Sequence, residues 1–99
     1  QELSAPHTVA REDVSETQCV FRIDFAEETA VNYLALREDI SQGQRVERFV
    51  IESDGSRLTD GTTVGSLRIC PLNGAKTRQL KLRIVAARDH VPSLDIRLY

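Results

Sequence analysis

The sequence lacks the features that usually mark a membrane protein, a disulfide-rich protein or a metal site. No apolar run approaches the ~20 residues that a membrane-spanning helix needs. Its two cysteines, Cys19 and Cys70, are too few for the disulfide framework of a small secreted domain and too far apart for a CxxC site. We expect two buried thiols, with a single disulfide as the alternative. The two histidines, His7 and His90, have no flanking ligand motif, so the sequence predicts no metal site and no cofactor.

An excess of charge of one sign is also missing. The 15 acidic and 13 basic residues give a net charge of −2, and the pI is about 5.7. A mildly acidic surface attracts neither nucleic acid nor an anionic membrane, so we expect neither as a partner. Residues 1–4 contain no basic or apolar region of the kind found in a signal peptide.

Apolar and polar residues alternate along most of the chain. In 17–25, the residues Cys19, Phe21, Ile23 and Phe25 share one face, as in a half-buried strand. No segment keeps the period of an amphipathic helix. We therefore predict an all-β protein, an antiparallel β-sandwich over 17–99, preceded by an irregular N-terminal arm over 1–16. The other expected strands are 31–38, 45–53, 67–70, 80–86 and 94–98.

Several local features refine the strand prediction. Val46 and Phe49 are three positions apart, so a β-bulge at 47–48 is needed to bring both into the core. The remaining interruptions are a polar break at 27–29, turns at Asp54-Gly55 and Asn73-Gly74, and Pro71, which should end its strand or place it at a sheet edge.

The sequence shows no catalytic constellation. Hydrolysis of a glycosidic bond, for example, needs two carboxylates that face each other across a cleft. Seven acidic residues in particular fall in loops, turns or solvent-facing strand positions, and we interpret them as solvated charges. They are Glu38, Asp39, Glu52, Asp54, Asp60, Asp89 and Asp95.

Four segments carry a resemblance to a known family. Residues 31–46 read VNYLALREDISQGQRV, 61–69 read GTTVGSLRI, 80–84 read LKLRI, and 92–99 read PSLDIRLY. In this order they resemble the motifs of the C-terminal β-sandwich of family 29 glycoside hydrolases, the α-L-fucosidases. That domain is similar to the galactose-binding, discoidin-like jelly rolls.

The resemblance implies a non-catalytic accessory domain. In the family, the nucleophile and the acid/base belong to a (β/α)₈-like barrel, and no segment of this chain matches them. The expected partner is therefore the catalytic domain of a parent enzyme that is secreted, periplasmic or lysosomal. We expect the loop 39–45 to dock on it through Gln42, Gln44 and Arg45, because these side chains offer directional hydrogen bonds. For Arg45, a salt bridge or cap within the domain is an equal alternative.

The second hypothesis is a carbohydrate-binding module for fucose- or galactose-containing glycans. Arg88, Asp89 and His90 in one loop, and Asn73 in another, could bind sugar hydroxyls. The chain has no tryptophan, and its five aromatic residues all fall in predicted strands, so we expect no aromatic platform for a sugar ring. A third possibility is an unrelated β-sandwich interaction module.

Overall fold

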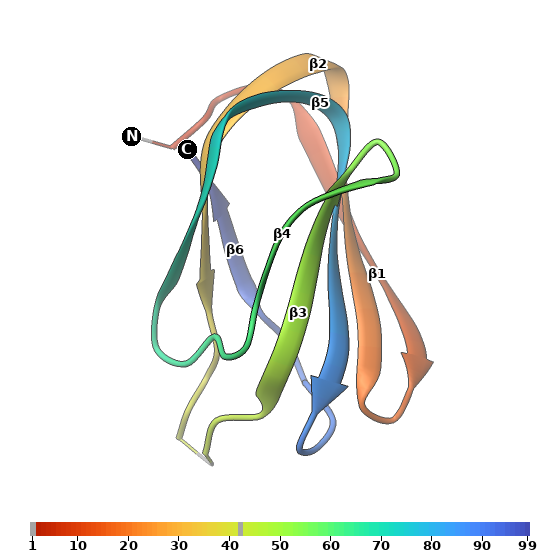
Figure 1. Ribbon diagram of the computed structural model, residues 1–99, viewed down its shortest axis with the longest axis vertical. Coiled ribbons are helices and arrows are strands. Elements are labelled where there is room, and N and C mark those ends of the chain that lie inside the picture. The colour runs from red at the N-terminus through yellow and green to blue at the C-terminus, as the bar shows by residue number, and fades with distance from the viewer. Residues whose placement is uncertain (1, 42) are drawn as a thin grey trace.

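The structure, a computed structural model, describes residues 2–41 and 43–99, and these residues contain six strands and no helix. All strand pairings are antiparallel, which confirms the predicted all-β sandwich (Figure 1). The strands are β1 (His7–Ser15), β2 (Gln18–Arg37), β3 (Val46–Ser53), β4 (Ser56–Gly61), β5 (Arg68–Ala87) and β6 (Asp95–Leu98). Within the described ranges, no helix is long and apolar enough to cross a membrane.

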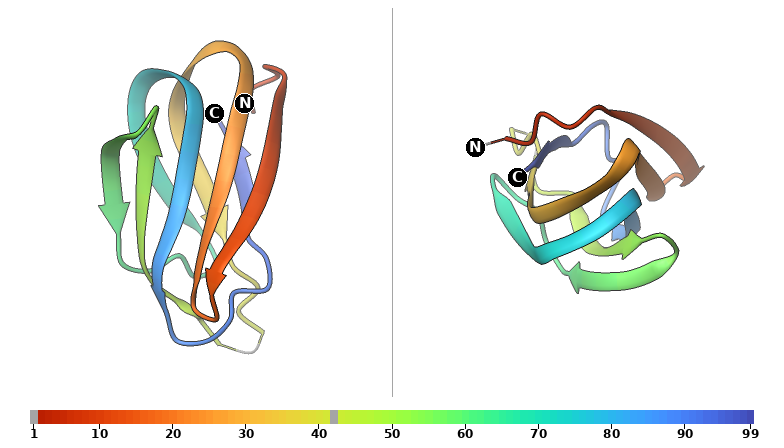
Figure 2. Two further views of the ribbon diagram at one scale, coloured as in Figure 1. Left: turned by 90° about the vertical axis from the view of Figure 1, so that its right-hand side faces the viewer. Right: turned by 90° about the horizontal axis from the view of Figure 1, so that it is seen from above.

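Two long strands, β2 and β5, bend and contribute to both layers of the sandwich (Figure 2). The first half of β2 pairs with β1 and with the second half of β5, which in turn pairs with β3. This gives a large sheet in the order β1-β2-β5-β3-β4. The second half of β2 pairs with the first half of β5 and with β6, which gives a small sheet of three strands.

The core lies between the two sheets. The predicted inward residues of the first half of β2 are buried, and Leu34 and Leu36 face them from the small sheet. Each fully buried Leu, Ile or Phe side chain contributes roughly 1.5–3 kcal/mol relative to exposure, so this layer is the main source of stability. The core also includes Phe49, Ile51, Leu80, Leu82, Ile84 and Leu98.

The predicted bulge and one predicted turn are confirmed. The register of β3 against β5 shifts on both sides of Arg48, and Val46 and Phe49 are both fully buried. Asp54 and Gly55 have φ of 49° and 86°. Positive φ at both central residues is the condition for a two-residue type I′ hairpin, which here joins β3 to β4.

The prediction of an irregular arm is wrong for His7–Ser15, which form β1 at the edge of the large sheet. The strand is held by its backbone ladder to β2, while nearly all of its side chains are exposed. A strand exposed on both faces has no alternation of hydrophobicity, so the sequence pattern gave no sign of it.

Three predicted interruptions lie inside the long strands instead. The predictions of a strand break at 27–29 and of a turn at Asn73-Gly74 are wrong, because β2 and β5 continue through these positions. Both are irregular positions: the β2–β5 register shifts between Asp24 and Thr29 and again near residue 32. Asn73 and Gly74 keep the positive φ of a turn. Pro71 does not end its strand, but it lies where β5 pairs with β2 alone, which agrees with the predicted edge position.

Candidate functional site

The loop predicted to bind sugars follows the end of β5. Arg88, Asp89 and His90 are all exposed, and an Asp89 carboxylate oxygen accepts a hydrogen bond from the His90 amide at 2.7 Å. The loop is anchored by Arg11 of β1, whose guanidinium donates to the carbonyls of residues 91 and 92. No sequence pattern pointed to this role of Arg11, because the two segments are about 80 positions apart.

Asn73, the fourth predicted sugar-binding residue, is not part of this loop. It lies in the first half of β5, next to Gly74, and the position of a Cβ on Gly74 would be 3.3 Å from the Asn32 side-chain oxygen. Arg88–His90 instead follow the second half of β5, which belongs to the large sheet (Figure 1). The structure therefore brings three of the four predicted residues together and separates the fourth.

The loop predicted to dock lies beside the sugar-site loop. Gln42 falls outside the described residues, Gln44 is exposed and Arg45 is half-buried. The Arg88 amide donates to the Arg45 carbonyl at 2.8 Å. The Arg88 guanidinium lies over Gly43, which has φ of 93°, a backbone conformation that glycine adopts readily. Within residues 2–41 and 43–99, Arg45 makes no ion pair. Residues 43–45 and the loop 88–90 therefore lie side by side at one end of the sandwich.

Glu38 holds this end together. Its side chain is only 8% exposed, and its two carboxylate oxygens accept hydrogen bonds from the amides of Arg45 (2.9 Å), Val46 (3.1 Å) and Gly65 (2.9 Å). The Glu38 amide donates to the Gly65 carbonyl at 2.8 Å. The interpretation of Glu38 as a solvated charge is therefore wrong, and its role is to join the end of β2 to the start of β3 and to the loop before β5.

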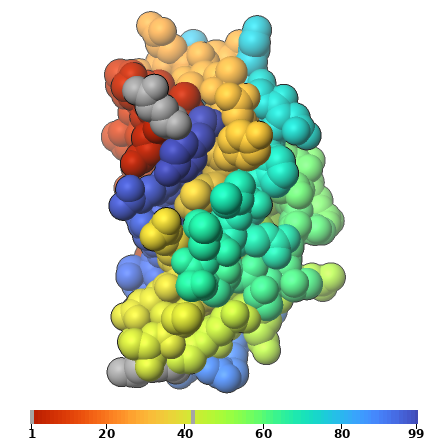
Figure 3. Space-filling model, turned by 90° about the vertical axis from the view of Figure 1, so that its left-hand side faces the viewer, coloured from red at the N-terminus to blue at the C-terminus, as the bar shows by residue number. Residues whose placement is uncertain are grey.

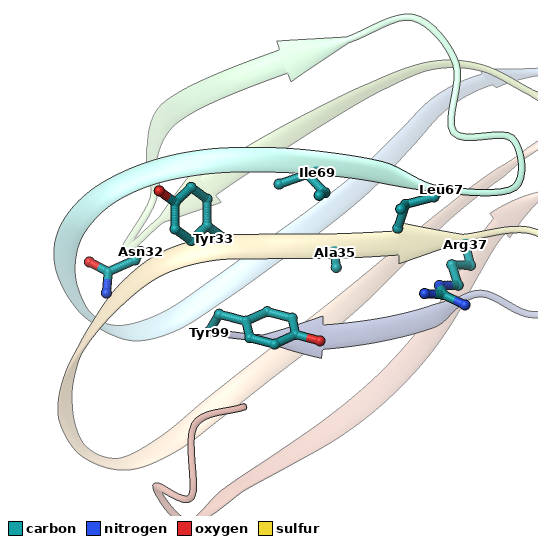
Figure 4. A pocket seen from close by; sticks show the side chains of 7 residues that line it. All are labelled: Asn32, Tyr33, Ala35, Arg37, Leu67, Ile69 and Tyr99. Atoms are coloured by element: carbon teal, nitrogen blue, oxygen red, sulfur yellow. The ribbon is translucent and has the colours of Figure 1, made fainter. Parts of the chain in front are cut away.

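The outer face of the small sheet is apolar. A groove of about 460 Å³ runs across it, lined by Asn32, Tyr33, Ala35, Arg37, Leu67, Ile69 and Tyr99. Figure 4 shows these side chains along the three strands, with Asn32 and Tyr33 at one end and Arg37 and Leu67 at the other. Figure 3 shows the same face, with β6, the second half of β2 and the first half of β5 lying across it.

Sheet register places these side chains outside rather than inside. Leu34 and Leu36 are buried against the core, so the alternate residues Tyr33, Ala35 and Arg37 point outward. Tyr33 is 49% exposed although it lies in a strand, so a strand position does not bury every aromatic ring as expected. Residues 31–38 are apolar on both faces, so the sequence alone does not show which of the two faces the core covers.

The outer face of the large sheet is different, because charged residues occupy its centre. Arg22 and Lys81 lie opposite each other on β2 and β5. Arg83 forms an ion pair with Glu52 at 2.9 Å. An exposed face of an antiparallel sheet is normally polar in this way, so the small sheet is the exception.

The titratable groups of the chain have pKa shifts with structural causes. Burial raises the pKa of both Cys19 and Cys70, which are free thiols as expected, so neither is an activated nucleophile. The Gln79 side-chain amide, followed by Arg22, holds the pKa of Asp24 below its ordinary value. The Ser41 amide does the same for Asp39. Among the described residues, no three His, Cys, Asp or Glu side chains gather as metal ligands.

Comparison with known proteins shows where such a domain occurs. No protein-family model matches the chain. Alpha-L-fucosidase 1 of Arabidopsis thaliana is 33% identical to it over 81 residues, which is 75% of this chain and 16% of that protein. The chain is a relative of the α-L-fucosidases.

Two solved GH29 structures share the fold of this chain. The crystal structure of SpGH29 superposes with a TM-score of 0.81 at 20% identity, over 100% of this chain and 28% of that one. A Ruminococcus gnavus GH29 fucosidase, solved in complex with fucose, superposes with a TM-score of 0.74 at 22% identity, over 93% of this chain and 20% of that one. The chain therefore corresponds to a minor part of each of these proteins.

Proposed function

We propose that this chain is a non-catalytic accessory domain, C-terminal in its parent α-L-fucosidase, that packs on and supports the catalytic domain. The observation that carries the proposal is the short match: the chain corresponds to between 16% and 28% of the length of its fucosidase relatives. The remaining length is available for the catalytic machinery.

The chemistry of the described surface agrees with this role. Glycoside hydrolysis needs a carboxylic acid and a carboxylate on opposite sides of the bond. The groove on the small sheet is lined by no carboxylate. Glu38, the most buried acidic side chain, has its oxygens occupied by backbone amides. The similarity to fucosidases supports a parent that is secreted, periplasmic or lysosomal.

The test compares the full-length fucosidase with two separate products, residues 1–99 alone and the enzyme without them. We expect residues 1–99 to release no product from an aryl α-L-fucoside. We expect the shortened enzyme to keep its catalytic residues but to lose activity faster on heating. Turnover by residues 1–99, or an unchanged inactivation rate of the shortened enzyme, would contradict the proposal.

A carbohydrate-binding module is the second candidate, and the exposed ring of Tyr33 is the observation that favours it. An NMR amide-shift titration of residues 1–99 with L-fucose, D-galactose and a fucosylated oligosaccharide separates the two. Saturable shifts at Arg88–His90 would support a sugar site at the predicted loop, and shifts at Tyr33 would support one on the small sheet. An accessory domain without a lectin role gives neither at millimolar concentration.

A further inference from the structure

We propose that the outer face of the small sheet is the surface through which this domain packs against the catalytic domain of its parent. The inference rests on the proposed function and names its contact surface. In this proposal the small sheet, and not the loop 39–45, is the centre of the interface. The loop lies beside the interface or outside it.

The face carries the main concentration of exposed apolar side chains in the described chain. Tyr33, Leu67 and Ile69 are 49%, 47% and 54% exposed and line one groove, with Ala35 between them. The other large exposed apolar side chains are on different elements: Val9 and Val14 on β1, Leu58 on β4 and Ile40 in a loop. Scattered apolar residues are normal on a surface, but a contiguous cluster marks a contact site.

The polar groups of the face lie at its margins, as in a protein–protein interface. Arg97 at the β6 side is already paired with Asp95 and Glu2, at 3.2 Å each. Arg37, at one end of the groove, makes no ion pair with any residue in 2–41 or 43–99. Interfaces typically have an apolar centre with a polar rim, and tyrosine and arginine are the residue types that most often anchor them. The partner surface is therefore apolar, with a carboxylate opposite Arg37.

The catalytic domain is the occupant that these features favour. Most of each fucosidase relative lies outside the matched part, so a large covalently linked partner is present at high effective concentration. A sugar is a poorer fit, because Leu67, Ile69 and Pro71 offer no side-chain hydrogen bond to hydroxyl groups along the β5 side of the face.

Thiol labelling of the full-length fucosidase tests the proposal. Leu67→Cys and Ile69→Cys place a thiol on the face, and Val9→Cys and Val14→Cys place matched thiols at positions 52% and 58% exposed on β1. A fifth variant, Gln44→Cys, reports on the loop. The native Cys19 and Cys70 are buried and give little background. Labelling by N-ethylmaleimide is followed peptide by peptide, with the unsubstituted chain as the blank.

We expect labelling at 67 and 69 to be at least about tenfold slower than at 9 and 14, and the difference to vanish in denaturant. Equal rates at these four positions overturn the proposal. If only the thiol at position 44 is labelled slowly, the domain docks through the loop, so this inference fails while the proposed function is kept. Fast labelling at all five positions contradicts the proposed function as well. Protection that appears only at high protein concentration assigns the face to a second copy of the protein. Protection that requires added L-fucose assigns it to a sugar. Either result overturns the proposal.

Discussion

Removal of the Glu38 carboxylate is the perturbation whose cost the structure defines best. Glu38→Ala leaves three backbone amides without their acceptor. A buried amide without an acceptor costs about 1–3 kcal/mol, and Val46 is fully buried, so we take about 2 kcal/mol for it. Water can reach the half-buried Arg45 and Gly65, so each of these amides adds about 0.5–1 kcal/mol. The expected loss in the free energy of unfolding is roughly 3–4 kcal/mol.

Such a loss lowers the melting temperature of a domain of this size by about 12 °C or more. The assay is urea and thermal unfolding of residues 1–99, followed by circular dichroism because the chain has no tryptophan. Glu47→Ala, at an exposed position in β3, is the matched control and should change the free energy of unfolding by no more than about 0.5 kcal/mol. Glu38→Gln keeps one acceptor oxygen, so its free energy of unfolding should lie between those of Glu38→Ala and Glu47→Ala. If Glu38→Ala unfolds with the same free energy as Glu47→Ala, the reasoning about the buried carboxylate is refuted.

Three further predictions follow from contacts of single residues. Gly61→Ala should destabilise the domain by about 1–3 kcal/mol in urea unfolding, because a Cβ at this position would overlap the buried ring of Phe49, and an unchanged midpoint contradicts this. The native thiols of Cys19 and Cys70 should react with a disulfide reagent only as fast as the domain unfolds, so rapid labelling of the folded chain would show that they are accessible. Asp24 has a pKa below its ordinary 3.8, so its stabilising effect is present above that pH and is lost as the pH falls through the lower folded value. Urea unfolding at several pH values should therefore show the difference between Asp24→Asn and the unsubstituted chain shrinking below about pH 4, and a difference constant with pH contradicts the assignment.

The sequence predicted the parts of the fold in which one side of a strand is covered. Alternation identified the buried face of 17–25, and the spacing of Val46 and Phe49 required the bulge that the structure contains. The Asp54-Gly55 turn was also predictable, because few residue pairs tolerate positive φ at both positions.

The remaining features depend on tertiary context. β1 has almost no buried side chain, so only its ladder to β2 makes it a strand. Asn73-Gly74 has turn chemistry but is used at an irregular position inside a strand. Glu38 is buried because amides from two other segments converge on it, and no local pattern reports such a convergence.

The candidate site was predictable only in part. Arg88–His90 and Arg45 lie in loops as expected, and their common location at one end of the sandwich comes from the pairing of β5 with β3. The apolar face was hidden because the sequence of 31–38 is apolar on both sides. Only the small sheet's position shows that Tyr33 is on the outside.

Differential scanning calorimetry of the proposed parent fucosidase tests the central proposal, that this domain packs on the catalytic domain, most directly. We predict one cooperative unfolding transition for the unsubstituted enzyme. Ile69→Arg, which puts a charge into the apolar face, should separate a lower transition for this domain, while Val14→Arg on the exposed edge strand should not. Two independent transitions in the unsubstituted enzyme, unaffected by Ile69→Arg, would contradict the account.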